Sequence, residues 1–161
     1  MLSYTCKTAV KAVIFLAIKH SSGEKAAIRE IAEYLEASEH TVGKMLQTLV
    51  KQGVINSLKG PTGGFFMSEE QLAQPIFNIV QAIDGNQVFK DCGLGLNKCS
   101  SLHPCPIHYE YKEARDIIEN LFRTKKISDL CEPVNNGLAY LFGSMFFTFK
   151  QISKLLYACK S

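Results

Sequence analysis

The most constraining feature of the chain is a pair of short amphipathic segments with only a turn between them. In residues 25–37 and again in residues 39–52, apolar side chains recur three or four positions apart, so each segment is predicted to be a helix with one buried face. The repeating apolar positions are Ile28, Ile31, Ala32 and Leu35 in the first segment and Val42, Met45, Leu46, Leu49 and Val50 in the second. Ser38 suits the N-cap of the second helix, and Gly53 suits its C-cap. Two short helices joined by a tight turn predict a helix-turn-helix.

A glycine-rich hairpin is predicted directly after the second helix. The runs 54–58 and 65–67 favour strands, and the sequence KGPTGG between them supplies a tight turn. Many surface helices have a polar face and many turns contain glycine, so neither feature is diagnostic by itself. Their order, a helix pair with a polar front followed by a hairpin, indicates a winged helix-turn-helix that binds DNA.

The DNA contacts are predicted on the outward face of the second helix and on the hairpin. Polar side chains of this size reach base edges and phosphates in a major groove. Lys59 is expected at the hairpin tip, where it can enter a minor groove, and the glycines leave backbone amides open to phosphates. The predicted DNA-contacting residues are Ser38, His40, Thr41, Lys44, Ser57, Lys59, Gly60, Pro61, Gly63 and Gly64.

The other segments complete a mostly α-helical plan. Helices are predicted at 3–20 and 70–84, followed by a loop at 88–104 and a long helix at about 106–125. The long helix has one apolar side and little of its own domain to pack against, which predicts a dimerisation element. The apolar positions on that side are Ile107, Tyr111, Ala114, Ile118 and Leu121.

The N-terminal segment has an apolar middle, but Lys7, Lys11 and Lys19 interrupt it and no small-residue cleavage site follows. We therefore expect neither a signal peptide nor a membrane span, and a cytoplasmic protein. In that compartment clustered thiols are more often metal ligands or redox centres than disulfides. The net charge is +3, and residues 1–66 hold 8 Lys and Arg against 5 Asp and Glu, a weak indication of a polyanionic partner.

Three of the six cysteines lie in one loop. Cys92, Cys99 and Cys105 lack the paired Cys-x-x-Cys spacing of a structural zinc site, and their longer gaps favour a ligand larger than one ion, such as an iron–sulfur cluster. His108 follows Cys105 by one helical turn and is the candidate fourth ligand, while Cys6 on the first helix is the alternative. No chemistry is assigned to the remaining residues of these types in and beyond the loop, namely His103, Cys131 and Cys159.

A long stretch of the chain resembles a known group of regulators. The sequence EIAEYLEASEHTVGKMLQTLVKQGVINSLKGPTGGFFMS, then IFNIVQAIDG and three spaced cysteines, is similar to the iron–sulfur transcription regulators of the IscR and NsrR type, in the Rrf-two superfamily. The resemblance covers about residues 2–132. It implies a homodimeric repressor on a pseudo-palindromic operator, with a cluster, 2Fe-2S, whose oxidation, nitrosylation or loss changes operator affinity. The implied cluster ligands are Cys92, Cys99, Cys105 and His108.

The chain departs from this group at three places. Lys59 stands where the wing usually has Arg, which keeps the charge but loses the planar fork of donors. Six residues separate Cys92 from Cys99, where the group more often has five. Relatives with an acidic fourth ligand carry Asp or Glu near positions 7–9, whereas this chain has Lys, Thr and Ala there, which favours His108.

Two rival hypotheses remain beside the cluster sensor. One is a winged-helix regulator controlled by thiol redox chemistry or by a partner, without a cluster. The other is a small electron carrier or metalloenzyme, which is disfavoured because no second acid/base constellation or substrate-binding motif is present.

The chain is expected to divide into four parts. These are a winged-helix DNA-binding domain at 1–85, a cysteine-rich cluster-binding loop at 86–108, a dimerisation helix at 106–132 and an aromatic extension at 133–161. We expect the extension to pack on the dimer, with membrane-surface or partner binding as the alternative.

Overall fold

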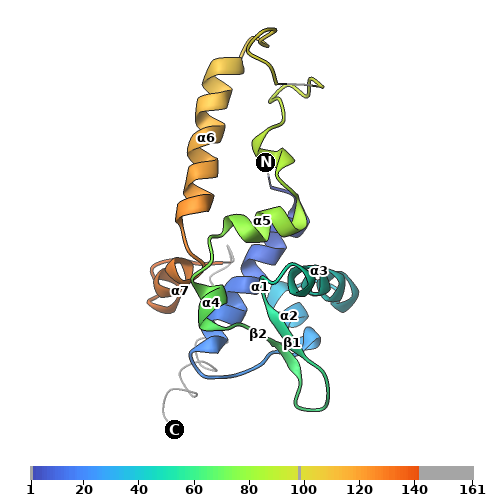
Figure 1. Cartoon of the computed structure of the whole chain (residues 1–161). Coiled ribbons are helices and arrows are strands. Elements are labelled where there is room, and N and C mark those ends of the chain that lie inside the picture. Colours follow the sequence, from blue (N-terminus) through green and yellow to red (C-terminus); the bar gives the residue numbers. More distant parts are fainter. Residues whose placement is uncertain (1, 98, 142–161) are drawn as a thin grey trace.

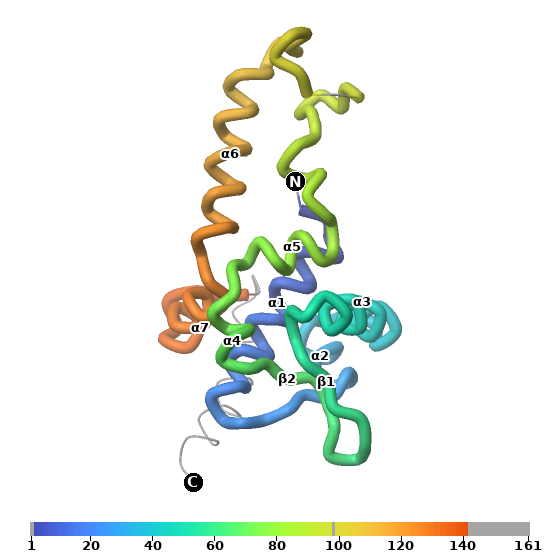
Figure 2. Tube along the Cα trace, in the orientation of Figure 1, coloured from blue at the N-terminus to red at the C-terminus, as the bar shows by residue number. Residues whose placement is uncertain are grey.

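The computed structural model describes residues 2–97 and 99–141. In chain order the elements are α1 (Tyr4–His20), α2 (Ile28–Leu35), α3 (Glu39–Lys51), β1 (Asn56–Leu58), β2 (Gly64–Phe66), α4 (Glu69–Leu72), α5 (Phe77–Ile83), the 3₁₀ helix η1 (Gln87–Phe89), α6 (His108–Thr124) and α7 (Ser128–Asn135). Figures 1 and 2 show a body that contains the helix pair and the hairpin, and an arm in which α6 and the segment before it project away from that body. The predicted fold class, mostly α with a two-stranded wing, is confirmed.

The core of the body lies between α1 and the helix pair. Val13 and Leu16 of α1 pack in one buried cluster with Ile31 of α2 and with Leu46 and Leu49 of α3. All five side chains are fully buried, and burial of a side chain of this size contributes about 1.5–3 kcal/mol. The apolar stripes of the sequence therefore hold the helix pair firmly against α1.

The turn between α2 and α3 has a defined geometry at both ends. Helix α2 ends at Leu35, and the C-cap residue Glu36 adopts the left-handed conformation with φ of 52° and donates its N–H to the carbonyls of Ala32 and Glu33. Helix α3 begins after Ser38, whose Oγ accepts a hydrogen bond from the Thr41 N–H at 3.2 Å. The predicted N-cap of the second helix is thus confirmed.

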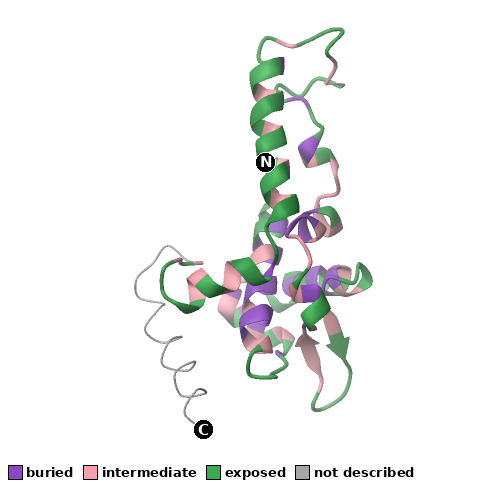
Figure 3. Cartoon of the chain, turned by 60° about the vertical axis from the view of Figure 1, so that its left-hand side comes forward, coloured by how far each residue is buried: buried purple, intermediate pink, exposed green. Residues whose placement is uncertain are grey.

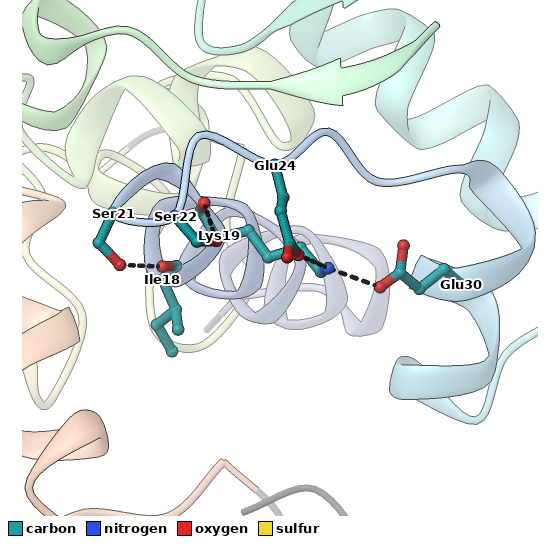
Figure 4. Close-up of polar contacts among 6 residues, drawn as sticks. All are labelled: Ile18, Lys19, Ser21, Ser22, Glu24 and Glu30. Carbon is teal, nitrogen blue, oxygen red and sulfur yellow. Dashed lines mark hydrogen bonds and ion pairs between the residues drawn. The ribbon is translucent and has the colours of Figure 1, made fainter. Parts of the chain in front are cut away.

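A cluster of polar contacts fixes the connection between α1 and α2 (Figure 4). Lys19 Nζ lies 2.6 Å from Glu24 Oε2 and 2.8 Å from Glu30 Oε1. Ser21 Oγ donates to the Ile18 carbonyl at 2.7 Å at the end of α1. Because Glu30 belongs to α2, these bonds tie the end of α1 to the start of the helix pair.

The wing is an antiparallel hairpin in which Asn56 lies opposite Phe66. The outer edge of β2 is covered where Ala26 exchanges both backbone bonds with Phe65, at 2.9 Å from the Ala26 N–H to the Phe65 carbonyl and at 2.8 Å in the other direction. The residues just before α2 therefore join the wing to the helix pair, and this part of the edge is not free to pair with another chain.

Two features of the C-terminal half differ from the prediction. The single helix predicted over 70–84 is wrong, because the segment forms α4 and α5 with Pro75 between them. Proline has no N–H to donate and disfavours a helical residue before it, so the helix breaks there. Helix α7 was not predicted as a separate element.

Helix α6 is exposed along most of its length (Figure 3), and His108 is its one buried residue. Within residues 2–97 and 99–141, no helix is both long and apolar enough to cross a bilayer. The aromatic stretch at 142–161 and Cys159 lie outside the described residues.

Candidate functional site

The face of α3 opposite the core and the tip of the wing are exposed to solvent. DNA contact requires such exposure, and the positive charges on it, Lys44 and Lys59, suit a polyanion. Of the predicted contact residues, Ser38, His40, Thr41, Lys44, Ser57, Lys59, Gly60 and Pro61 are exposed, and Gly63 and Gly64 are half-buried. Their contact with DNA stays a prediction.

The two glycines that close the wing turn have a steric reason to be glycine. A Cβ atom at Gly63 would lie 2.2 Å from the Leu58 carbonyl oxygen, which no side chain tolerates. Gly64 has φ of +150°, and a Cβ there would lie 2.9 Å from the Ala26 oxygen. The tight approach of backbone to backbone gives the wing a fixed shape.

The base of the wing is anchored by Gln71, a buried polar residue. Its Oε1 accepts hydrogen bonds from Asn56 Nδ2 and from the Ser68 N–H, both at 3.0 Å, and its Nε2 donates to the Gly53 carbonyl at 3.2 Å. The amide of one side chain thus connects the end of α3, the start of β1 and the start of α4. Sequence patterns gave no signal for this role.

His20, at the end of α1, provides a second anchor. Its Nδ1 lies 2.8 Å from the Met67 carbonyl oxygen and its Nε2 lies 2.9 Å from Glu69 Oε1. Both neighbours are acceptors, so the doubly protonated ring suits them best, and the hydrogen bond to Glu69 raises the pKa of His20 above its ordinary value. This residue was also missed by the sequence pattern.

The four predicted cluster ligands form two close pairs. Cys92 Sγ and Cys105 Sγ are 3.7 Å apart, and Cys99 Sγ lies 3.4 Å from His108 Nδ1. Cys92 and His108 are buried, whereas Cys99 and Cys105 are half-buried. In the described part of the chain, no group of three or more His, Cys, Asp and Glu side chains converges on one metal ion.

Cys92 has surroundings that favour the thiolate. Hydrogen bonds from the backbone N–H groups of Leu94 and Leu96 lower its pKa, with smaller contributions from the Cys105 thiol and from the positive charge of Arg115. A thiolate is the form that binds metals and attacks disulfides. The sequence gave no signal that Arg115 lies near this residue.

Cys6, the alternative fourth ligand, lies in a different environment. It is fully buried in an apolar cluster with Phe77, Val80 and Phe89. Burial, with the negative charge of Asp84 nearby, raises the pKa of this thiol to about 12. A thiol that resists ionisation is a poor metal ligand. The side chain that contacts Cys99 Sγ is His108 and not Cys6.

The other residues of these types have ordinary environments. His103 is exposed in the loop. Cys131 is half-buried in α7, its Sγ lies 3.5 Å from the Ile127 carbonyl oxygen, and burial raises its pKa to about 11. Neither observation assigns chemistry to them.

An aromatic contact connects the arm to the body three residues before Cys92. The ring of Phe89 lies 5.5 Å from that of Phe77 in α5 and 6.0 Å from that of Phe122 in α6, measured between centroids. The guanidinium of Arg123 lies 3.6 Å from the centre of the Phe77 ring. Displacement of the cysteine loop would therefore disturb the packing of Phe89 on α5 and on the base of α6.

A helix pair with a polar front, followed by a rigid glycine-closed wing, defines a winged-helix DNA-binding protein. The sequence model of the Rrf2 family, described as "Iron-dependent Transcriptional regulator", matches residues 2–133, so the chain belongs to the Rrf2 family. An HTH-type transcriptional regulator of Aquifex aeolicus is 30% identical over 132 residues, which cover 81% of this chain and 90% of the relative. The chain is accordingly a DNA-binding transcription regulator and not an enzyme.

Two solved structures share the fold. CymR, the global cysteine regulator of B. subtilis, superposes with a TM-score of 0.67 at 19% identity, over 82% of this chain and 96% of that one. IscR of T. potens superposes with a TM-score of 0.66 at 18% identity, over 91% of this chain and 96% of that one. Identities this low establish the shared fold alone.

Proposed function

We propose that the chain is a homodimeric repressor that binds a pseudo-palindromic operator, and that an iron–sulfur cluster held by Cys92, Cys99, Cys105 and His108 controls its affinity for DNA. The cluster is expected to be 2Fe-2S, because the candidate ligands divide into two pairs. The observation that carries the proposal is the spacing within those pairs.

Each pair suits a metal ion of its own, because among the described residues no group of three or more candidate ligands converges on one ion. Two sulfurs bound to one tetrahedral ion by bonds of about 2.3 Å lie about 3.8 Å apart, and a sulfur and an imidazole nitrogen lie about 3.5 Å apart. Cys92 and Cys105 are separated by 3.7 Å, and Cys99 and His108 by 3.4 Å. Thiolates and imidazole are the protein ligands of two-iron clusters. The donor set therefore fits a cluster with one pair on each iron.

The exposed apolar side of α6 supports a homodimer. Ile117 is 65% exposed, and Ile118 and Leu121 are each about half exposed, along a helix that the body leaves uncovered. Pairing of this side with its copy would place two α3 helices on one duplex. Half-sites read in this way are centred about 34 Å apart or at a multiple of that distance.

Contacts near the ligand loop support a coupling between this loop, α5 and the base of α6. Residue Cys92 follows η1, and Phe89 in η1 packs on Phe77 of α5 and Phe122 of α6. If a cluster were bound, Cys92, Cys99 and Cys105 of the loop and His108 of α6 would hold it together, so the loop would be tied to the start of α6. The loop conformation then biases the orientation of α6 against the body, which shifts the population between dimers that fit the operator and dimers that do not.

Anaerobic purification with iron and sulfide analysis tests the cluster. We expect about two iron and two sulfide per subunit with visible absorbance for the wild type, and loss of both in Cys99→Ala and in His108→Ala. His103→Ala and Cys131→Ala are the matched controls, since each removes the same side-chain type at a position with no paired ligand. An intact, equally stable cluster in His108→Ala excludes His108 as the fourth ligand.

A thiol switch without a cluster is the second candidate function. It is favoured by the 3.7 Å contact between Cys92 and Cys105 and by the lowered pKa of Cys92, because a thiolate beside a second thiol forms a disulfide readily when a small disulfide oxidant accepts the two electrons by thiol–disulfide exchange. Protein that is colourless, free of iron and sulfide, and loses DNA affinity on oxidation in a Cys92- and Cys105-dependent way would establish this alternative.

A further inference from the structure

Two side chains of α6 hold the residues on either side of Cys92. Arg115 Nη1 donates a hydrogen bond of 2.7 Å to the carbonyl oxygen of Asp91, which precedes Cys92. Gly93, which follows Cys92, lies against the ring of Tyr111: a Cβ at Gly93 would be 2.8 Å from Tyr111 Cδ2 and 2.9 Å from Cγ and Cε2. The backbone of the loop thus touches α6 immediately before and immediately after the cysteine.

Tyr111 and Arg115 act from one face of the helix. They are four residues apart, the spacing that places side chains on the same side of a helix, and the Arg115 guanidinium lies 6.0 Å from the centre of the Tyr111 ring. The ring thereby limits the positions that the guanidinium can take. We call these two residues the α6 clamp.

The clamp keeps part of a charged group away from water. Arg115 Nε is buried and has no hydrogen-bond partner among the described residues, although its Nη1 is bonded to Asp91. A buried donor without a partner is unfavourable. The bond to Asp91 and the contact with Tyr111 offset this cost and hold the guanidinium beside Cys92.

We propose that Tyr111 and Arg115 are positioning residues that set Cys92 in its ligand position before any cluster is bound. The ligand role of Cys92 rests on the proposed function, but the clamp itself is a property of the metal-free chain. Cys92 therefore serves as the fixed ligand, around which the exposed remainder of the loop is arranged.

Hydrogen exchange of the anaerobic, metal-free protein tests the clamp. Arg115→Met removes the bond to Asp91, so amides of the segment 88–97 are expected to exchange about fivefold faster, the effect of one hydrogen bond. Arg115→Lys retains a donor at the end of a long side chain and is expected to restore part of the protection. Lys112→Met is the matched control, because Lys112 is exposed on the same helix and pairs with Asp116 instead. Equal exchange in Arg115→Met and Lys112→Met overturns the proposal.

The glycine provides an independent steric test. Gly93→Ala places a methyl group against the Tyr111 ring and is expected to raise exchange in the same segment. Tyr111→Ala removes the ring, so Gly93→Ala added to Tyr111→Ala should produce no further change. Fully additive effects of the two substitutions contradict a shared contact.

The rate of iron loss from the cluster-loaded protein is a further test, because a purely structural role of Arg115 in the body would not change it. Arg115→Met is expected to lose iron to a chelator at least threefold faster than the wild type, while the melting temperature of the body is unchanged. The two proposals can fail separately. If the wild type takes up no iron or sulfide on anaerobic reconstitution, the proposed cluster is overturned. If Arg115→Met nevertheless speeds hydrogen exchange, the clamp is supported. Unchanged iron loss and unchanged exchange together overturn the clamp alone.

Discussion

The DNA-reading body and the cysteine-bearing arm are stabilised in opposite ways. In the body, α1, α2 and α3 share a continuous apolar core whose central side chains are fully buried. In the arm, α6 buries only His108, and Leu102 in the loop is 85% exposed. Packing fixes the winged-helix body, whereas a few polar contacts, the thiol and imidazole pairs and the aromatic contact of Phe89 hold the arm. Local stability follows buried apolar contacts, so the arm is the element whose conformation a weak signal can change.

The largest expected effect is a loss of stability when the core of the body is disrupted. Leu49→Ala removes a fully buried side chain from the core, and we expect it to lower the free energy of unfolding by about 2–5 kcal/mol. Leu102→Ala makes the same change in the exposed loop and is expected to leave the unfolding midpoint within experimental error. Urea unfolding followed by circular dichroism measures both variants, and comparable destabilisation by the two would contradict the contrast between body and arm.

The next effect concerns the shape of the wing. Gly63→Ala forces a Cβ into the Leu58 carbonyl, and overpacking of this kind costs about 1–3 kcal/mol. Since the wing must distort to accommodate it, operator affinity is expected to fall about tenfold or more. Thr62→Ala, at an exposed position of the same turn, is the control. Fluorescence anisotropy with an operator duplex provides the measurement, and unchanged affinity in Gly63→Ala would show that the wing does not contact DNA.

A smaller effect is expected when one positive charge is removed from the wing or from the arm. Lys59→Gln at the wing tip is expected to reduce the slope of log affinity against log salt by about one, as for one phosphate contact. Lys112→Gln removes an exposed charge, paired with Asp116, from α6 and should leave the slope unaltered. Salt titration of duplex binding distinguishes the variants. Equal slopes for both would exclude a contact between Lys59 and a DNA phosphate.

The smallest effect is a pH dependence of the wing anchor. The pKa of His20 is raised in the folded protein, so its contribution to stability is full below about pH 6.5 and is lost as the pH rises through the folded pKa. Because Glu69 is largely exposed, the contribution is expected to be below about 1 kcal/mol. Urea midpoints between pH 5.5 and 8.5 should fall more for the wild type than for His20→Gln, and parallel curves would exclude this anchor.

The body was largely predictable because its fold follows from repeating apolar positions. Val42, Met45, Leu46 and Leu49 all enter the core as the helical pattern indicated, and Ser38 caps α3. The pattern failed at Pro75, where apolar periodicity continued across a residue that cannot continue a helix. Local backbone chemistry outweighed periodicity at that point.

The site was predictable only in part, since sequence spacing does not encode contacts between distant segments. The candidate ligands could be named from the cysteine loop, but the pairing of Cys92 with Cys105 and of Cys99 with His108 could not. The contact of Arg115 with the Asp91 carbonyl spans 24 positions and uses a backbone atom, which no side-chain pattern reveals. Gln71 and His20 were missed for the same reason.

The backbone exchange between Ala26 and Phe65 limits how the protein can respond to a signal. It joins the wing to the helix pair, so in the proposed dimer we expect a change in the arm to tilt or separate the two winged-helix bodies without reshaping either one. Base preferences within a half-site should therefore be identical in the active and inactive forms. What should change is tolerance to the spacer: an operator with one base pair inserted between its half-sites should shift the balance between the forms, whereas a base change inside a half-site should weaken both equally.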